Sequence, residues 1–300
     1  MPYLGLINLN KPSGITSRRA VDLVGRVAGK TKIGHAGTLD PLADGVLVLC
    51  LGSATRLIEY VQQMPKQYSG TFLLGRRSDT EDTYGNVVEL SSPPIPTLEE
   101  IKTAAGGLCG LIQQCPPVFS AIKIKGQRAY HLARAGKSPD LKARPVRVYR
   151  IDVVSYEYPV LKLDIECGSG TYIRSIGRDL AESLGTAAVM SALTRTAIGR
   201  FILEDSIDLN DLEQQDLSRC LLPPVTGVEM LPKVKLEPQD VIEVGHGRTI
   251  PMPINASVLC KSQTTKRLEF AGIAPDGRLV AILIPQDQHR LRPLRNFPVN

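Results

Sequence analysis

The stretch GHAGTLDPLADGVL, residues 34–47, sets one histidine and two aspartates among glycines and a proline, and it runs into the apolar segment 46–51. That segment predicts a buried strand, and the glycines give the preceding loop unusual backbone freedom. Asp40 is the early carboxylate of this loop. His35 and Asp40 are a candidate acid/base pair, but an aspartate before proline is by itself more typical of a turn. Its role therefore depends on the rest of the chain.

Composition predicts a globular protein with a large core. The chain has 300 residues, of which 43% are hydrophobic, enough for one large domain and a small one. Six dispersed cysteines without a C-x-x-C pair indicate reduced thiols and argue against structural zinc. Neither a membrane-spanning run nor a secretory signal is visible in the sequence. These features predict a cytoplasmic protein that does not associate with membranes.

Positive charge is concentrated in one window. Residues 121–150 hold nine Lys/Arg against one acid, a net +8, while the whole chain carries +6 and the remainder therefore about −2. A solvated surface usually interleaves both signs, so this window favours a polyanionic partner such as a nucleic acid. The candidate contacts are Lys123, Lys125, Arg128, Arg134, Lys137 and Arg144.

Strand and helix patterns alternate through the first two thirds of the chain. We expect helices at 17–28, at 53–63, from the Thr97–Glu100 capping box toward residue 108, and from about residue 171. Expected strands cover 3–9, 46–51, 67–74, 147–155, 161–166 and 193–196. Several connections are too short for crossovers, so the fold class is α+β with a mixed, largely antiparallel sheet.

From residue 221 the composition of the chain changes, and prolines become frequent. Pro223, Pro224, Pro232 and Pro238 predict a linker over 223–237 that ends a domain of residues 1–222. Short strands are expected at 240–244, 267–272 and 278–284. They predict a small β-barrel over residues 238–300.

Two further stretches hold candidate functional residues. In CGSGTYIRSIGRDLAESLG, residues 167–185, Thr171 is a possible helix cap, and Arg174 lies in the first turn, where its charge opposes the helix dipole. An acidic partner elsewhere would explain that position, and an ordinary surface arginine is the alternative. In KQYSGTFLLGRRSDTEDTYG, residues 66–85, Tyr68 either packs in the core or stacks on a base.

Taken together, these motifs resemble those of the bacterial tRNA pseudouridine synthase B family, the T-loop uridine isomerases. The stretches NKPSGITS (10–17) and PPVFSAIKIKGQRAYHLAR (116–134) extend the similarity from about residue 4 to residue 200. A weaker similarity to that family's PUA module is found in GHGRTIPMP (245–253) and DGRLVAI (276–282). The resemblance implies the pseudouridine synthase fold with a PUA-like C-terminal domain.

The resemblance also implies roles for single residues. Asp40 would be the catalytic carboxylate on a loop that glycines bring close to the nucleotide, and Arg174 would pair with it and favour its ionised form. Attack at the sugar C1′, attack at C6 of the base and removal of a sugar proton all remain open for Asp40. Tyr68 would stack on the base. Other implied active-site positions are Tyr172 and Leu193 in the pocket wall, His35 holding the extruded nucleotide, and Lys11, which steadies the loop or contacts RNA backbone.

The implied substrate is tRNA, with uridine isomerised to pseudouridine at position 55. The segment 117–146 would clamp the T-arm, and the C-terminal domain would touch the acceptor end. The resemblance implies a monomer that needs no cofactor or metal. Two other classes stay open on the residues alone: an RNA-binding and refolding factor, and a hydrolase using His35 and Asp40, for which a second acid or a metal set is missing.

Overall fold

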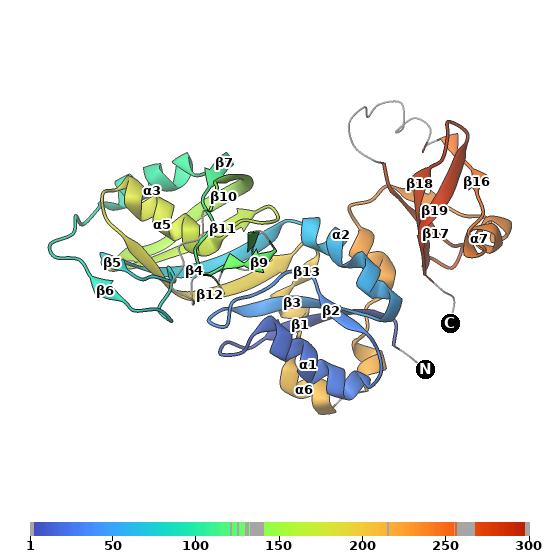
Figure 1. The fold of residues 1–300 in the computed structure, drawn as a ribbon, viewed down its shortest axis with the longest axis horizontal. Helices are drawn as coiled ribbons and strands as arrows, with labels where there is room; N and C mark the ends of the chain where they lie inside the picture. The colour runs from blue at the N-terminus through green and yellow to red at the C-terminus, as the bar shows by residue number, and fades with distance from the viewer. Residues whose placement is uncertain are drawn as a thin grey trace.

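The computed structural model describes residues 3–120, 122–124, 126–129, 132, 141–214, 216–254, 256 and 268–297. These residues form a large unit around one ten-stranded sheet and a small C-terminal unit around a five-stranded sheet. The small unit lies at one end of the elongated molecule (Figure 1). None of the helices in these residues is both long enough and apolar enough to cross a membrane.

The large sheet is mixed and mostly antiparallel, as the sequence predicts. Its order is β14-β1-β3-β12-β4-β11-β10-β7, with β2 added to β3 and β13 to β12. Among the strand pairs of this sheet that the structure describes, only β1/β14 and β3/β12 are parallel. The strands are β1 (Gly5–Lys11), β2 (Ile33–His35), β3 (Asp44–Leu51), β4 (Lys66–Leu74), β7 (Gly110–Gln114), β10 (Arg144–Glu157), β11 (Val160–Cys167), β12 (Ala188–Ile198), β13 (Phe201–Ile202) and β14 (Ile207–Asp208).

Two hydrophobic cores use opposite faces of β3. Leu47, Leu49 and Leu51 point into the core beneath the helices α1 (Ser17–Ala28), α3 (Leu98–Gly107), α5 (Ile173–Ser183) and α6 (Leu209–Gln214). Val46, Val48 and Cys50 point into a second core, which contains residues of η1 (Gly52–Leu57), α2 (Ile58–Gln63) and η4 (Pro224–Val228). Burial on both faces explains why this strand is apolar at each position from Val46 to Leu51 rather than alternating.

The helix boundaries follow local capping chemistry. The Thr16 hydroxyl accepts a hydrogen bond from the Arg19 amide at 3.0 Å, which starts α1 at the predicted residue. The predicted capping box at Thr97 and Glu100 is present at the start of α3. The helix predicted at 53–63 begins as the 3₁₀ turn η1 and becomes α-helical only at Ile58.

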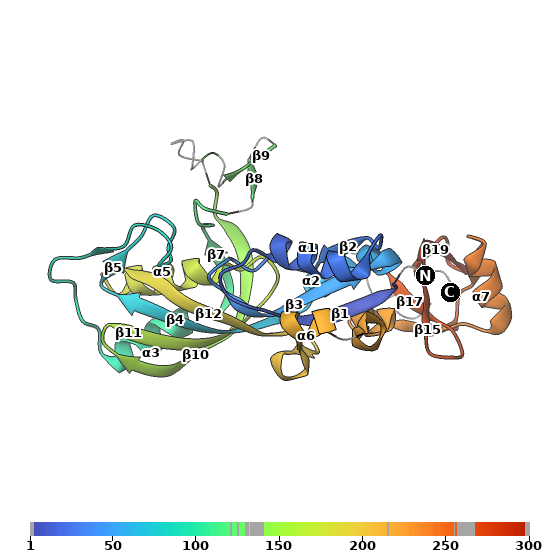
Figure 2. The ribbon, with the colours of Figure 1, turned by 90° about the horizontal axis from the view of Figure 1, so that it is seen from below.

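Two small hairpins leave the large sheet. One pairs β5 (Arg76–Arg77) with β6 (Val88–Glu89), and the other pairs β8 (Lys123–Ile124) with β9 (Gln127–Arg128). Figure 2 shows β8 and β9 projecting away from the large sheet. The basic window that begins at residue 121 therefore starts on a protrusion.

The C-terminal unit is an open sheet in the described residues, ordered β15 (Lys233–Lys235), β17 (Phe270–Ile273), β18 (Leu279–Pro285), β19 (Arg290–Asn296) and β16 (Ile250–Pro251). The strand predicted at 240–244 is wrong, because these residues belong to the helix α7 (Pro238–Gly245). Pro238 lies in the first turn, where its missing amide costs nothing, and Glu237 and Asp240 form a capping box. These local signals outweigh the short apolar stretch.

The segment predicted as a linker is folded and packed. Residues 223–237 contain η4 and β15, and Val228 is fully buried in the second core. Pro224 starts η4 as Pro238 starts α7, so two of these prolines mark helix starts rather than a loose connection. The same core contains Ala271, Ile282 and Phe297 of the small unit, which is therefore docked on the large one.

Gly45 should be indispensable for stability. It has φ of +94°, and a Cβ there would lie 2.3 Å from the Arg195 carbonyl oxygen of the neighbouring strand β12. We expect Gly45→Ala to lower the free energy of unfolding by at least about 2 kcal/mol in urea titrations. The control is Gly25→Ala in α1, where a Cβ meets nothing within 4 Å and where alanine should stabilise by about 0.5–1 kcal/mol. Equal unfolding midpoints for the two variants would contradict this account.

Candidate active site

The loop that carries Asp40 is held on both sides by the N-terminal stretch 10–17. The Ser17 hydroxyl accepts a hydrogen bond from the Leu39 amide at 2.8 Å and donates one to the Leu39 carbonyl at 3.0 Å. The Gly14 amide donates to the Pro41 carbonyl at 2.7 Å. The residue before Asp40 is thus fixed to the start of α1 and the residue after it to the turn that precedes α1, which gives the carboxylate a rigid base.

The side chain of Lys11 supports the same N-terminal stretch from the protein interior. It is fully buried, and its ammonium donates to the carbonyls of Pro12 and Ile15 at 2.8 and 2.9 Å. Burial lowers the pKa of Lys11 to about 8. Of the two roles expected for Lys11, the enclosed ammonium fits steadying the loop and does not fit contact with RNA backbone.

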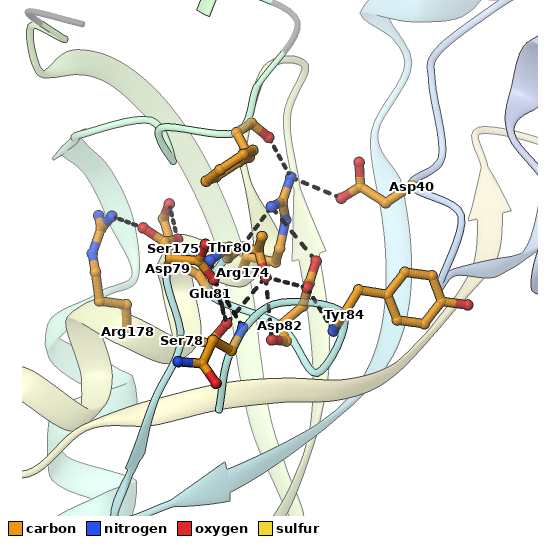
Figure 3. Close-up of polar contacts among 12 residues, drawn as sticks. Asp40, Ser78, Asp79, Thr80, Glu81, Asp82, Tyr84, Arg174, Ser175 and Arg178 are labelled. Atoms are coloured by element: carbon orange, nitrogen blue, oxygen red, sulfur yellow. Dashed lines mark hydrogen bonds and ion pairs between the residues drawn. The ribbon is translucent and has the colours of Figure 1, made fainter. Parts of the chain in front are cut away.

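Arg174 reaches the Asp40 carboxylate from the first turn of α5 (Figure 3). Its Nη2 lies 3.0 Å from Asp40 Oδ2, and Arg174 is 5% exposed while the Asp40 side chain is 37% exposed. The guanidinium also donates to the carbonyls of Thr80 and Phe119 at 2.7 and 3.0 Å. A buried cation therefore fixes the direction of a carboxylate that solvent can reach.

The cap predicted for this helix is wrong. The N-cap is Tyr172, which makes no side-chain capping bond, and the Thr171 hydroxyl instead donates to the Gly168 carbonyl at 3.2 Å. The first turn of α5 thus begins without a polar cap.

A second carboxylate, Asp82, lies on the other side of the guanidinium, and sequence reasoning missed it. Asp82 is buried, and its Oδ2 is 3.6 Å from Arg174 Nη1. Its Oδ1 accepts hydrogen bonds from the Thr80 hydroxyl at 2.5 Å and the Tyr84 amide at 3.0 Å. Three carboxylates within the four residues 79–82 were the available signal. Arg174 thus lies between one buried and one accessible carboxylate.

The loop that carries Asp82 is anchored to both α5 and β12. Glu81 forms an ion pair with Arg178, one helical turn beyond Arg174, and accepts a hydrogen bond from the Ser175 hydroxyl at 3.0 Å. Burial raises the pKa of Glu81, an effect that the Arg178 charge opposes. The Glu81 carbonyl also accepts from the Met190 amide at 3.0 Å. The position of Arg174 is therefore braced by the chain around it.

Tyr68 and Leu193 lie on one face of the sheet, in the core that borders the Asp40 loop. The β4/β12 register pairs Tyr68 with Arg195 and Gly70 with Leu193, and the side chains of Tyr68 and Leu193 are buried. Burial raises the pKa of Tyr68, so its phenol is uncharged at neutral pH. Leu193 thus provides an apolar surface, and Tyr68 provides an uncharged aromatic ring.

Arg195 is a second buried arginine that the sequence did not single out. Its Nε donates to the Val46 carbonyl at 2.7 Å and its Nη2 to the Gly37 carbonyl at 3.0 Å, so it joins the two ends of the Asp40 loop. His35, half-buried on β2, lies within its field. Burial lowers the pKa of His35, and the charge of Arg195 lowers it further, which favours a neutral imidazole.

Tyr172 and Arg144 meet at the edge of the site. The Tyr172 amide and carbonyl bond to the Gln114 side chain at 2.8 and 3.0 Å, and the Arg144 guanidinium lies 5.1 Å from the centre of the Tyr172 ring. Arg144 also donates to the Gly170 carbonyl at 2.6 Å. Of the other predicted RNA contacts, Lys125, Arg134 and Lys137 lie outside the described residues, and for Lys123 and Arg128 only the backbone is described.

The Lys11 ammonium should make stability depend on pH with a defined sign. Its pKa of about 8 in the fold lies below the ordinary value of 10.5, so the unfolded chain binds the proton more tightly. Between about pH 8 and 10.5, wild type should therefore gain stability with rising pH relative to Lys11→Met. Urea unfolding at several pH values measures this difference, and Lys30→Met at an exposed site is the control. A constant difference between wild type and Lys11→Met would contradict the buried position of the ammonium.

Sequence comparison places the chain among known proteins. The model of the TruB family pseudouridylate synthase, N-terminal domain, matches residues 25–173. The tRNA pseudouridine synthase B of Caulobacter sp. strain K31 is 41% identical over 98% of this chain and 96% of that protein. The protein of the same name from a strain of Dehalococcoides mccartyi is 36% identical over the same shares of the two chains.

Solved structures share the fold. A chain of a Cbf5–Nop10–Gar1 complex superimposes with a TM-score of 0.74 at 25% identity, covering 98% of this chain and 84% of that one. A chain of an H/ACA ribonucleoprotein bound to a substrate RNA containing 2′-deoxyuridine gives a TM-score of 0.73 at 24% identity, covering 99% and 86%. With the near full-length similarity to its curated relatives, the chain belongs to the TruB family of pseudouridylate synthases.

Proposed function

We propose that this chain isomerises uridine to pseudouridine at position 55 in the T-loop of tRNA, with Asp40 as the catalytic carboxylate. The observation that carries the proposal is the Asp40–Arg174 ion pair of 3.0 Å, in which the arginine is buried and the carboxylate accessible. A protein that only binds RNA has no use for this arrangement, because burying a charge is costly. Relatives named tRNA pseudouridine synthase B support tRNA as the substrate.

The proposed reaction rearranges the target nucleoside without adding or removing atoms overall. The N1–C1′ bond breaks, the uracil turns in place, and a C5–C1′ bond forms. The C5 hydrogen leaves as a proton, and N1 gains one. Asp40 meets the sugar–base junction, and Arg174, itself fixed by the carbonyls of Thr80 and Phe119, holds the Asp40 carboxylate in one direction. Little reorganisation is therefore needed during the reaction.

The neighbouring residues suit an extruded uridine. Tyr68 offers a neutral ring for stacking and Leu193 an apolar wall, while the neutral imidazole of His35 helps to hold the nucleotide out of the loop. Tyr172 completes the wall. Extruding a base costs a few kcal/mol, less in a loop than in a duplex, and stacking in the pocket offsets that cost.

The remainder of the chain would bind tRNA outside the loop. The segment 117–146 is proposed to clamp the T-arm by charge, using Lys123, Lys125, Arg128, Arg134, Lys137 and Arg144. The C-terminal unit from residue 238 is proposed to be a PUA-like module at the acceptor end, carried by the catalytic domain 1–222. In this proposal the enzyme acts in the cytoplasm as a monomer, without a cofactor or metal.

Replacing the Asp40 charge should separate catalysis from binding. With tRNA transcript carrying tritium at uridine C5, wild type should release the label to solvent, and Asp40→Asn should release none because the isosteric amide cannot act as a carboxylate. Affinity for tRNA should stay within a few-fold. The control is Asp22→Asn, an exposed carboxylate on α1 that pairs with Arg18. If Asp40→Asn turned over normally, the proposed role of Asp40 would be wrong, and label retained by wild type would favour an RNA-binding factor.

Salt dependence tests the clamp. Replacing Lys123, Lys125 and Arg128 together by alanine should weaken tRNA binding. The slope of log affinity against log salt concentration should become less steep, by about 0.7–0.9 for each phosphate that is no longer neutralised. Lys102→Ala, which removes an exposed cation of α3 paired with Glu99, should leave the slope unchanged. A triple variant with the wild-type slope would place the RNA surface elsewhere.

A further inference from the structure

An exposed aromatic ring stands beside the catalytic pair. Tyr84 is 60% exposed in a chain with 5% aromatic residues and no tryptophan. In Figure 3 its side chain extends past Asp82 toward the side of the cluster on which Asp40 lies. The reaction as proposed above makes no use of this ring.

The backbone beneath Tyr84 is rigid and coupled to the pair. The Tyr84 amide donates to Asp82 Oδ1 at 3.0 Å, and the other oxygen of that carboxylate faces Arg174 at 3.6 Å. The neighbouring Thr83 amide donates to the Met190 carbonyl of β12 at 3.0 Å. A Cβ on Gly85 would lie 2.2–2.4 Å from three side chains, so the turn is closely packed at this residue. The backbone that carries the ring is therefore held by Asp82, the same carboxylate that faces Arg174.

The charge around the ring restricts what it can meet. Residues 78–86, SDTEDTYGN, contain three carboxylates and no lysine or arginine. Two of these carboxylates are already paired, Glu81 with Arg178 and Asp82 with Arg174, so the loop itself offers a phosphate no cation to pair with. A nucleobase is uncharged and has a flat π face, for which a tyrosine ring is a suitable stacking surface.

We infer that Tyr84 stacks on a nucleobase of the substrate RNA next to the extruded uridine. The inference rests on the proposed function, which it deepens by naming a contact to a second nucleotide. Extruding one base unstacks its neighbour, and a fixed ring at that place restores a stacking partner. The contact should depend on the ring and not on the phenolic hydroxyl or on salt.

Steady-state tritium release from labelled tRNA transcript, with wild type, Tyr84→Ala and Tyr84→Phe, tests this inference. Loss of one base–aromatic stack should raise KM about tenfold in the alanine variant, with kcat within about twofold of wild type. The phenylalanine variant should match wild type. The salt slope of tRNA binding should be equal in all three proteins, because each keeps the same contacts to phosphate.

Ile95→Ala is the matched control, because Ile95 is an apolar residue that is 64% exposed and lies in the segment between β6 and α3. An alanine variant at residue 84 with wild-type KM would overturn the inference, as would a phenylalanine variant as impaired as the alanine one, which would indicate a hydroxyl contact. A changed salt slope would also overturn it. Absence of tritium release from wild type would refute the proposed function itself, so the two failures are distinguishable.

Discussion

A buried guanidinium needs hydrogen-bond acceptors, and in this protein three separate segments of the chain supply the acceptors of Arg174. Asp40 comes from the loop before β3, Thr80 and Asp82 from the loop between β5 and β6, and Phe119 from the segment after β7. Without these acceptors the buried charge would cost several kcal/mol. The site therefore forms only when the three segments are correctly placed, which joins its geometry to the fold of the whole large unit.

Other buried cations follow a different rule. Lys11 and Arg195 donate to main-chain carbonyls, and Lys66 does the same at the carbonyl of Met64. Burial lowers the pKa of Lys11 and of Lys66 to about 8 in each case. These side chains fasten loops through main-chain oxygens rather than through carboxylates. In this arrangement Asp40 pairs with Arg174 and keeps part of its carboxylate exposed.

The sequence was informative where local chemistry decides the structure. The span of α1, the capping box of α3 and the apolar β3 follow from capping and periodicity, and the motifs around Asp40 and Arg174 indicated the family. Asp82 and Arg195 could not be found in this way. Their positions depend on how the loop between β5 and β6 folds back on β12 and on the register of β12 with β3. Residues 240–244 were misassigned because a short apolar stretch fits a strand or a helix equally well.

The shared second core has a consequence for how the chain can be divided. Val46 and Val48 of the strand behind Asp40 belong to the same packed cluster as Ile282 and Phe297, near the other end of the sequence. Truncation before residue 230 would remove Ala271, Ile282 and Phe297 from the core that packs on this face of the strand. The C-terminal unit therefore contributes part of the packing under the strand that follows Asp40, and a chain shortened to the large unit would leave a gap in the core next to that strand.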